Sequence, residues 1–501
     1  MLIALVLALA SVAWAQAPPN RPAAPDAGSQ AGAPAKAQPR PPKPDVVPSS
    51  SGQQPPKAPP GQSKEAPAQA SPDYHITPKE AKELLSAVDE VLRFDSADTG
   101  LRIRHEIKRQ LVDRQQVQKY VEERIREDED AQRLRSSEAV LKKLGLLPKD
   151  FDLQAFLVEL LREQVAGYYD TKSKTVYLLD WLQPSSQLPV MAHELTHALQ
   201  DQNFGLEKWI GKGTSEKTPS QEVRGDEEIA ARHAVVEGQA MAVMIDYLLE
   251  PTGGSVVKSP LITEAIQQSM MESSDSPVFN RAPLFLKRVL LFPYRYGLDF
   301  ERELLVKGGK EKAFAGVFKS PPQNTRQVME PATYLAGEKL ADMPVPDIAK
   351  LLGENWEKYD VGSIGEFDIA VMAEIYADPD TAIKIYPHWR GGWYYAAKRK
   401  DGGELVLVMV TKWENAATAA AFQALYASTV AKRYSVDPGV PGAGLGASSS
   451  GPSIMWTRWN TSNGPVEIAT TDETVIAIEC VPADMVDRIR YAVLGTRPVN
   501  H

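Results

Sequence analysis

Cysteine is almost absent from this sequence, because Cys480 is the only one among 501 residues. A single cysteine excludes an intrachain disulfide and every cysteine-rich metal site. Cys480 stands in the largely apolar run 475–481, which predicts a buried cysteine in a strand rather than a reactive thiol.

Long basic blocks and long apolar runs are also missing. The net charge is -9 and the pI is near 5.5, so we expect no nucleic acid as the main partner. Basic residues cluster at 102–114, but the acid-rich run 122–130 follows, as is typical of a solvated helix face. No stretch reaches the roughly 20 apolar residues that a bilayer requires, so no permanent transmembrane anchor is expected.

The first residues are apolar, and Ala13-Trp14-Ala15 supplies the small-x-small pattern of a signal-peptidase site. We therefore predict a signal peptide at 1–15 and an exported protein, periplasmic or extracellular, although no Lys or Arg precedes the apolar run. Residues 16–72 are rich in Pro, Ala, Gln, Ser and Gly, a composition that predicts a disordered linker.

Ordered structure is expected to begin at Thr77, where Thr77, Pro78 and Glu80 form a helical start with a capping box. Apolar residues then keep a helical period over 84–92, 107–125 and 151–165. Two β-rich runs flank a polar turn within 166–180, which predicts a hairpin. Its strand could pair with an extended peptide, or the hairpin could be purely structural.

The motif His193-Glu194-Leu195-Thr196-His197 follows this hairpin. We expect Pro189 to begin its helix and Gly205 to end it. Residues four apart share a helix face, so the two imidazoles could bind one metal ion with Glu194 beside them. This H-E-x-x-H spacing is that of zinc metallopeptidases, in which the glutamate takes a proton from the attacking water.

A catalytic zinc ion takes three protein ligands, so a third is required from elsewhere. Glu237 lies in an Ala/Val/Met-rich part of a predicted helix at 226–249, where an ionised carboxylate would be costly unless it bound a metal or a partner. We predict Glu237 as the third ligand. His233, one turn earlier, is the alternative ligand or a neighbour of the site, and Asp201 could brace the His197 ring or bind the following loop.

Three stretches together resemble the gluzincin-type bacterial metallopeptidases of the peptidase MA-like group: 166–170 (AGYYD), 193–202 (HELTHALQDQ) and 237–240 (EGQA). The similarity covers roughly residues 80 to 340. It implies a mostly helical catalytic fold with a small sheet, one Zn²⁺ ion bound by the two histidines and Glu237, and Glu194 as general base.

Segments 292–297 and 321–331 also resemble that group, except that relatives tend to carry histidine where this chain has Glu330. If that histidine is catalytic in the relatives, activity here is in question. Tyr294, Arg295 and Tyr296 are candidate oxyanion donors, or parts of a loop with a packing role.

The last third of the chain shows a different pattern of predicted secondary structure. Strands are predicted at 393–397, 405–411, 454–459, 466–470 and 474–481, and helices at 416–432 and 482–494. We therefore predict an α+β protein, in which a mostly helical catalytic domain with a small sheet (73–340) precedes a smaller α+β domain (341–501).

The leading hypothesis is an exported zinc-dependent endopeptidase acting on protein or peptide substrates. The alternatives are a catalytically silent, zinc-stabilised binding protein of the same fold, and a hydrolase of a non-peptide amide. The sequence indicates no oligomeric state.

Overall fold

The computed structural model describes residues 74–126, 128–165, 167–211, 219–272, 276–436, 442–445 and 454–495. The predicted signal peptide (1–15) and linker (16–72) lie outside these residues, as does Ala166 of the hairpin motif. Among the described residues, no helix is both long and apolar enough to cross a membrane.

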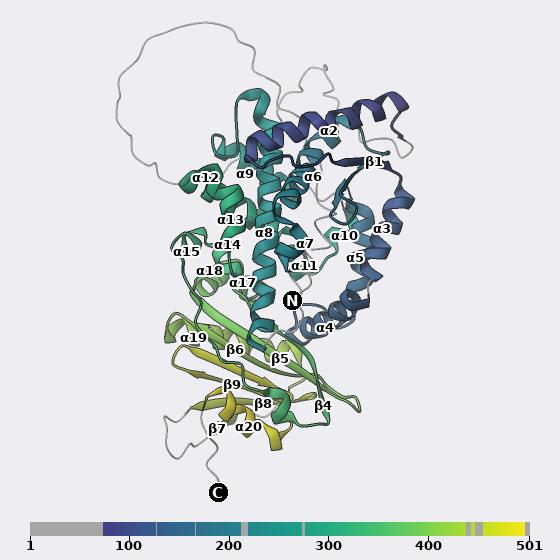
Figure 1. The fold of residues 1–501 in the computed structure, drawn as a ribbon. Helices are drawn as coiled ribbons and strands as arrows, with labels where there is room; N and C mark the ends of the chain where they lie inside the picture. The colour runs from purple at the N-terminus through teal and green to yellow at the C-terminus, as the bar shows by residue number, and fades with distance from the viewer. Residues whose placement is uncertain are drawn as a thin grey trace, which may run out of the picture.

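Helices make up the first part of the fold, in the upper half of Figure 1. The earlier ones are α2 (Pro78–Thr99), α3 (Arg114–Arg126), α4 (Asp128–Leu144), α5 (Leu153–Gln164), α6 (Pro184–Phe204), α7 (Leu206–Ile210) and α8 (Pro219–Leu249). The later ones are η1 (Glu250–Thr252), α9 (Pro260–Glu272), α10 (Pro277–Asn280), α11 (Leu284–Phe292), η2 (Pro293–Gly297), α12 (Leu298–Lys310), η3 (Glu311–Gly316), α13 (Val317–Lys319), α14 (Thr325–Met329) and α15 (Pro331–Leu335).

The predicted start at Thr77 is confirmed, with its side chain accepting a hydrogen bond from the Glu80 amide in a capping box. The helical reading of 107–125 is wrong in its first part. Residues Lys108–Val112 form strand β1, which pairs in parallel with β3 (Thr175–Leu179), and α3 begins only at Arg114.

A small sheet lies beside these helices and has the strand order β1-β3-β2. Strand β2 (Tyr168–Asp170) is antiparallel to β3. The Asp170 carboxylate accepts hydrogen bonds from the amides of Lys172 and Ser173 in the turn between them. The predicted hairpin is therefore confirmed, and β2 lies at an edge of this sheet.

The last part of the chain contains a seven-stranded antiparallel sheet, in the order β4-β5-β6-β10-β9-β8-β7. Its strands are β4 (Trp356–Ser363), β5 (Trp389–Arg399), β6 (Val406–Trp413), β7 (Gly442–Leu445), β8 (Met455–Thr461), β9 (Gly464–Thr471) and β10 (Thr474–Glu479). The accompanying helices are α16 (Ile348–Leu352), α17 (Glu366–Tyr376), α18 (Pro379–Ile385), η4 (Tyr386–His388), α19 (Ala416–Arg433) and α20 (Ala483–Val493). The predicted α+β class is confirmed.

Helix α8 connects the two parts of the fold, running down the helical part toward the sheet in Figure 1. A Cβ added to Gly365, just after β4, would lie 2.0 Å from Oε1 of Glu227 on α8, so the two elements are in close contact. One hydrophobic core contains buried residues on both sides of position 340. The two parts therefore pack against each other, while the boundary at 340 stays a prediction.

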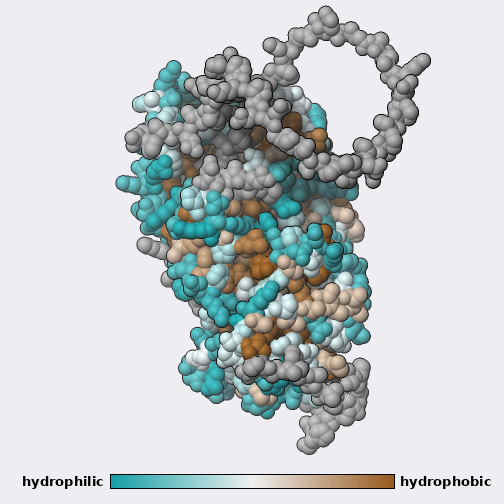
Figure 2. Space-filling view, turned by 180° about the vertical axis from the view of Figure 1, so that it is seen from behind, coloured by the Kyte–Doolittle hydropathy of each residue, from teal (hydrophilic) through white to brown (hydrophobic). Residues whose placement is uncertain are grey.

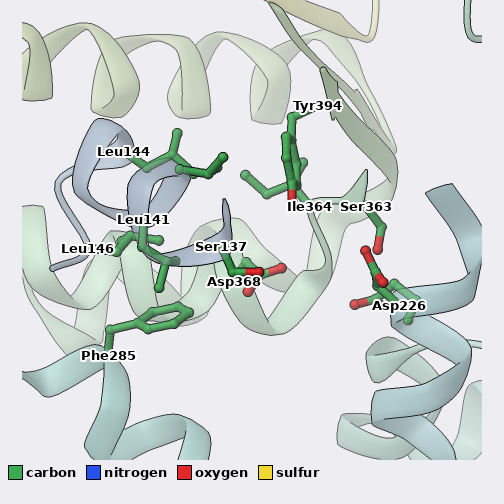
Figure 3. A pocket seen from close by; sticks show the side chains of 12 residues that line it. Ser137, Leu141, Leu144, Leu146, Asp226, Phe285, Ser363, Ile364, Asp368 and Tyr394 are labelled. Carbon is green, nitrogen blue, oxygen red and sulfur yellow. The ribbon is translucent and has the colours of Figure 1, made fainter. Parts of the chain in front are cut away.

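A small cavity of about 40 Å³ lies at this junction (Figure 3). Leu141, Leu144 and Phe285 line one side of it, and the carboxyl groups of Asp226 and Asp368 line the other. Burial raises the pKa of Asp368 to about 6.

Cys480 is buried directly after β10, and its thiol accepts a hydrogen bond from the ammonium group of Lys143 at 2.9 Å. The prediction of burial is confirmed. On the face shown in Figure 2, hydrophobic residues gather toward the middle among more hydrophilic ones.

Candidate metal centre

Helix α6 carries both histidines of the predicted metal site. It begins at Pro184, one turn earlier than expected, so Pro189 lies inside the helix rather than at its start. Gly205 ends it in the left-handed conformation, with its amide donating to the carbonyl of Asp201, as predicted. The middle of α6 is buried on all sides, so its two imidazoles face protein rather than open solvent.

Three side-chain atoms converge at this place. The Nε2 atoms of His193 and His197 are 3.1 Å apart, and Oε2 of Glu237 lies 3.2 Å from the first and 3.6 Å from the second. All three side chains are buried. Within the described residues, no other group of three His, Cys, Asp or Glu side chains is close enough to hold a metal ion.

These separations can be compared with the geometry of zinc. Zinc sites are usually tetrahedral, with bonds of about 2.0–2.1 Å to nitrogen and oxygen, which places neighbouring ligand atoms about 3.3 Å apart. The three observed distances bracket that value. Two imidazoles and one carboxylate also leave a fourth position for water or substrate, as in catalytic zinc sites. The residues present therefore fit a zinc ion.

The charges at the site are strongly coupled. Burial alone would raise the pKa of Glu237, but the two imidazoles hold it well below its usual range. Burial alone would lower the pKa of His197, but the carboxylates of Glu237 and Glu194 raise it to about 9. Without a metal, a buried positive charge is thus favoured between the ligands, which is the charge that a cation would supply.

Glu194 is buried beside the ligands and is held by the backbone of β2. Its Oε2 accepts a hydrogen bond of 2.8 Å from the amide of Tyr169. Burial raises the pKa of Glu194, and the two imidazoles lower it in part. A Cβ added to Gly167 would lie 3.1 Å from Val190 and 4.0 Å from Cγ of Glu194, so glycine lets the hairpin approach α6 closely.

The turn η2 closes the site from the side of α8. A Cβ on Gly238 would lie 2.2 Å from the carbonyl oxygen of Gly297, and a Cβ on Gly297 would lie 2.2 Å from that of Ala234. Only glycine at both positions permits this approach. The turn η2 is π-helical, a conformation that is rare in proteins but that often lies at a functional site where it does occur.

Tyr294 is carried by η2 and is buried next to the ligands, with its ring centroid 6.4 Å from that of His193. Burial raises the pKa of Tyr294 well above its usual value, and the carboxylates of Glu237 and Glu194 and a hydrogen bond to Glu237 raise it further. The phenol is therefore protonated at neutral pH and is able to donate a hydrogen bond within the site.

Tyr296 does not lie at the metal centre. Two positions apart on a helical turn face nearly opposite directions, so its ring lines a different pocket with Phe292, Arg295 and Tyr386. The prediction of Tyr296 as an oxyanion donor is therefore wrong, because its side chain does not reach the metal centre. His233 is buried on α8, one turn from Glu237, but is not one of the three converging ligands.

Asp201 does not brace the His197 ring. It accepts hydrogen bonds from the Tyr169 hydroxyl, the Lys174 ammonium group and the Leu206 amide, so the alternative of a partner for the following loop holds. The contact with Nδ1 of His197 is made by Oε1 of Gln200 at 2.9 Å. Sequence reasoning missed Gln200, although its spacing three residues after His197 could have indicated it.

Glu330 lies outside the metal centre. Its carboxylate is 2.9 Å from the guanidinium group of Arg326, which also pairs with Glu338 and Glu366. Glu330 therefore belongs to an ion network that joins α14 to α17.

Comparisons with known proteins do not extend this picture. The chain matches no known protein family, no curated protein and no solved structure.

Proposed function

We propose that this protein is an exported zinc-dependent endopeptidase, similar to the gluzincin-type metallopeptidases. The observation that carries the proposal is the convergence of His193, His197 and Glu237 at zinc-ligand distances, with the Glu194 carboxylate buried beside them. Export is proposed from the sequence of residues 1–15 alone.

When bound, zinc lowers the pKa of a coordinated water toward about 7 and polarises a carbonyl group. Glu194 is the general base in this proposal. The Tyr169 amide fixes one of its oxygens, so the carboxylate is oriented before substrate arrives. Burial raises the pKa of Glu194 toward neutral pH. A group with such a pKa can both accept a proton from water and return it to the leaving amine effectively.

Tyr294 is the proposed donor to the oxygen on which negative charge develops. Its phenol is protonated, buried and next to Glu237. A preorganised donor in a site that excludes water stabilises such charge strongly. Tyr296 has no part in this step, because it lines the pocket on the other side of η2.

The edge strand β2 is the proposed binding place for an extended peptide. It pairs with β3 on one side only, and its residue Tyr169 contacts the general base directly. A peptide added to this edge would run beside Glu194 and would bond to groups of β2 other than the Tyr169 amide, which already donates to Glu194. This edge supports the proposal of protein or peptide substrates.

The test is a comparison of wild type with Glu194→Gln. We expect purified wild type to hydrolyse casein in a chelator-sensitive manner, and Glu194→Gln to retain zinc but lose activity by at least about a hundredfold, as for removal of a general base. Glu207→Gln is a matched control, because the Glu207 carboxylate accepts a hydrogen bond from the Thr171 hydroxyl at 3.0 Å and is not one of the three converging ligands. Full activity of Glu194→Gln would refute the mechanism. A zinc-loaded wild type that cleaves no peptide would favour a silent binding protein.

A further inference from the structure

Gln200 on α6 and Gln239 on α8 form a buried pair behind the metal centre, and neither is a metal ligand. Oε1 of Gln200 contacts Nδ1 of His197 at 2.9 Å, and Nε2 of Gln200 donates to Oε1 of Gln239, also at 2.9 Å. Both side chains are fully buried. We infer that Gln200 and Gln239 are positioning residues that impose on His197 the tautomer that binds the metal through Nε2. This inference rests on the proposed zinc site.

The orientation of the Gln200 amide is fixed by a backbone carbonyl. Its Nε2 donates to the carbonyl oxygen of Val236 at 3.0 Å. A carbonyl oxygen only accepts, so the nitrogen of the amide must face Val236 and the oxygen must face the His197 ring. An amide oxygen likewise only accepts, so Nδ1 of His197 must carry the proton.

Gln239 repeats the same restriction from a second direction. Its Nε2 donates to the carbonyl oxygens of Ala313 and Phe314, at 2.9 and 3.2 Å. The oxygen of its amide is thereby turned toward Gln200, where it requires a donor. Two independent sets of carbonyl groups, on α8 and on η3, therefore force the same orientation of Gln200.

The consequence reaches the metal centre. A neutral imidazole with its proton on Nδ1 has a free lone pair on Nε2, the atom that points at His193 and Glu237. His193 differs, because its buried Nδ1 has no hydrogen-bond partner in the described part of the chain. When a metal ion takes the place of the proton on Nε2, the contact with Gln200 thus keeps the remaining proton of His197 on Nδ1, whereas no described residue fixes the proton on Nδ1 of His193.

Gln200 also joins the two helices that supply ligands. It lies on α6 three residues after His197, and its bond to Val236 ends one residue before Glu237 on α8. Partners of metal-bound histidines typically change metal affinity by 10–100-fold when they are removed. We expect the loss of zinc affinity on replacement of Gln200 to lie in this range. Replacement of Gln239 should have a smaller effect, because Val236 still orients Gln200.

The experiment measures the zinc dissociation constant by chelator competition for wild type, Gln200→Met and Gln239→Met. The matched control is Gln187→Met. Gln187 is also fully buried on α6, but its side-chain amide bonds to the backbone of Leu179 and Leu182 rather than to a metal ligand. We expect the dissociation constant to rise about 10–100-fold for Gln200→Met, several-fold for Gln239→Met and not at all for Gln187→Met.

Nitrogen-15 NMR of the histidine rings in the zinc-loaded full chain gives a second readout. In wild type the Nδ1 proton of His197 should exchange slowly with water. In Gln200→Met this proton should exchange rapidly, while the signals of the His193 ring should not change. Zinc affinities of the two test variants equal to that of Gln187→Met, or zinc bound to Nδ1 of His197, would overturn the inference alone. A wild type that binds no zinc would overturn the proposed function as well.

Discussion

The contact between Gly238 and Gly297 allows a sharp test of how the metal centre is built, because it can be perturbed without changing a ligand. A Cβ at position 238 would lie 2.2 Å from the carbonyl oxygen of Gly297, whereas ordinary contacts begin near 3.4 Å. Backbone on one side or the other must therefore move by about 1 Å. Tyr294, on the same turn, would move with it, away from Glu237.

Two effects of Gly238→Ala oppose each other. Alanine in a helix is favoured over glycine by about 1 kcal/mol, whereas overpacking a core costs about 1–3 kcal/mol and sometimes more. Because the obstacle is a backbone carbonyl rather than a flexible side chain, the steric cost should exceed the gain. We predict a net loss of about 1–2 kcal/mol in the free energy of unfolding, together with weaker zinc binding.

Urea unfolding followed by circular dichroism measures the first effect, and chelator competition measures the second. Gly308→Ala is the control. Gly308 lies exposed in α12, and the three atoms nearest to its added Cβ, at 2.5–3.1 Å, belong to the side chain of Lys312 rather than to backbone. Because the side chain of Lys312 can move aside more easily than a backbone carbonyl, this control should change the free energy of unfolding by less than about 1 kcal/mol and should keep the zinc affinity of wild type. A Gly238→Ala variant as stable as Gly308→Ala would show that the close approach of α8 and η2 is wrong.

Two further predictions concern buried carboxyl groups. Burial beside Gln239 raises the pKa of Glu301 to about 8 in the folded chain, so protonated Glu301 stabilises the fold at low pH and this stabilisation is lost as the pH rises toward 8. The stability of Glu301→Gln relative to wild type, measured by urea unfolding, should therefore increase by roughly 3–4 kcal/mol between pH 5 and pH 8. A difference that does not depend on pH would contradict this. Glu479 accepts hydrogen bonds from Arg433, Tyr426 and Tyr434 in the core, so Glu479→Gln should lower the midpoint of thermal unfolding and cost about 3–5 kcal/mol. The exposed Asp401→Asn should leave that midpoint unchanged, and an equal drop for both variants would refute the burial argument.

Local patterns in the sequence were sufficient for much of the fold. The capping box at Thr77, the hairpin and five strands of the large sheet follow from periodicity and turn chemistry, which are properties of neighbouring residues. Strand β1 was misread as helix, because its pairing partner β3 lies more than sixty residues further on. Strand β4 was missed because its first half is polar and largely exposed at the sheet edge.

In the metal centre, too, local sequence patterns predict some residues, whereas others depend on tertiary contacts. His193, Glu194 and His197 follow from helical spacing alone, and Glu237 from the cost of an isolated carboxylate in an apolar helix. The roles of Tyr169, Gln200 and Gly297 depend on which elements meet in space, and spacing along the chain does not determine that. For the same reason spacing indicates that Tyr294 and Tyr296 face opposite ways, but it does not determine which of them faces the metal centre.

The central claim is that two helices hold one zinc ion through His193, His197 and Glu237. The most direct test is the metal content of the purified chain, measured by mass spectrometry of the elements, for wild type, Glu237→Ala and the control Glu330→Ala. We predict about one zinc per chain in wild type and in Glu330→Ala, and almost none in Glu237→Ala. A wild type without metal, or a Glu237→Ala variant that keeps its full zinc content, would contradict the claim.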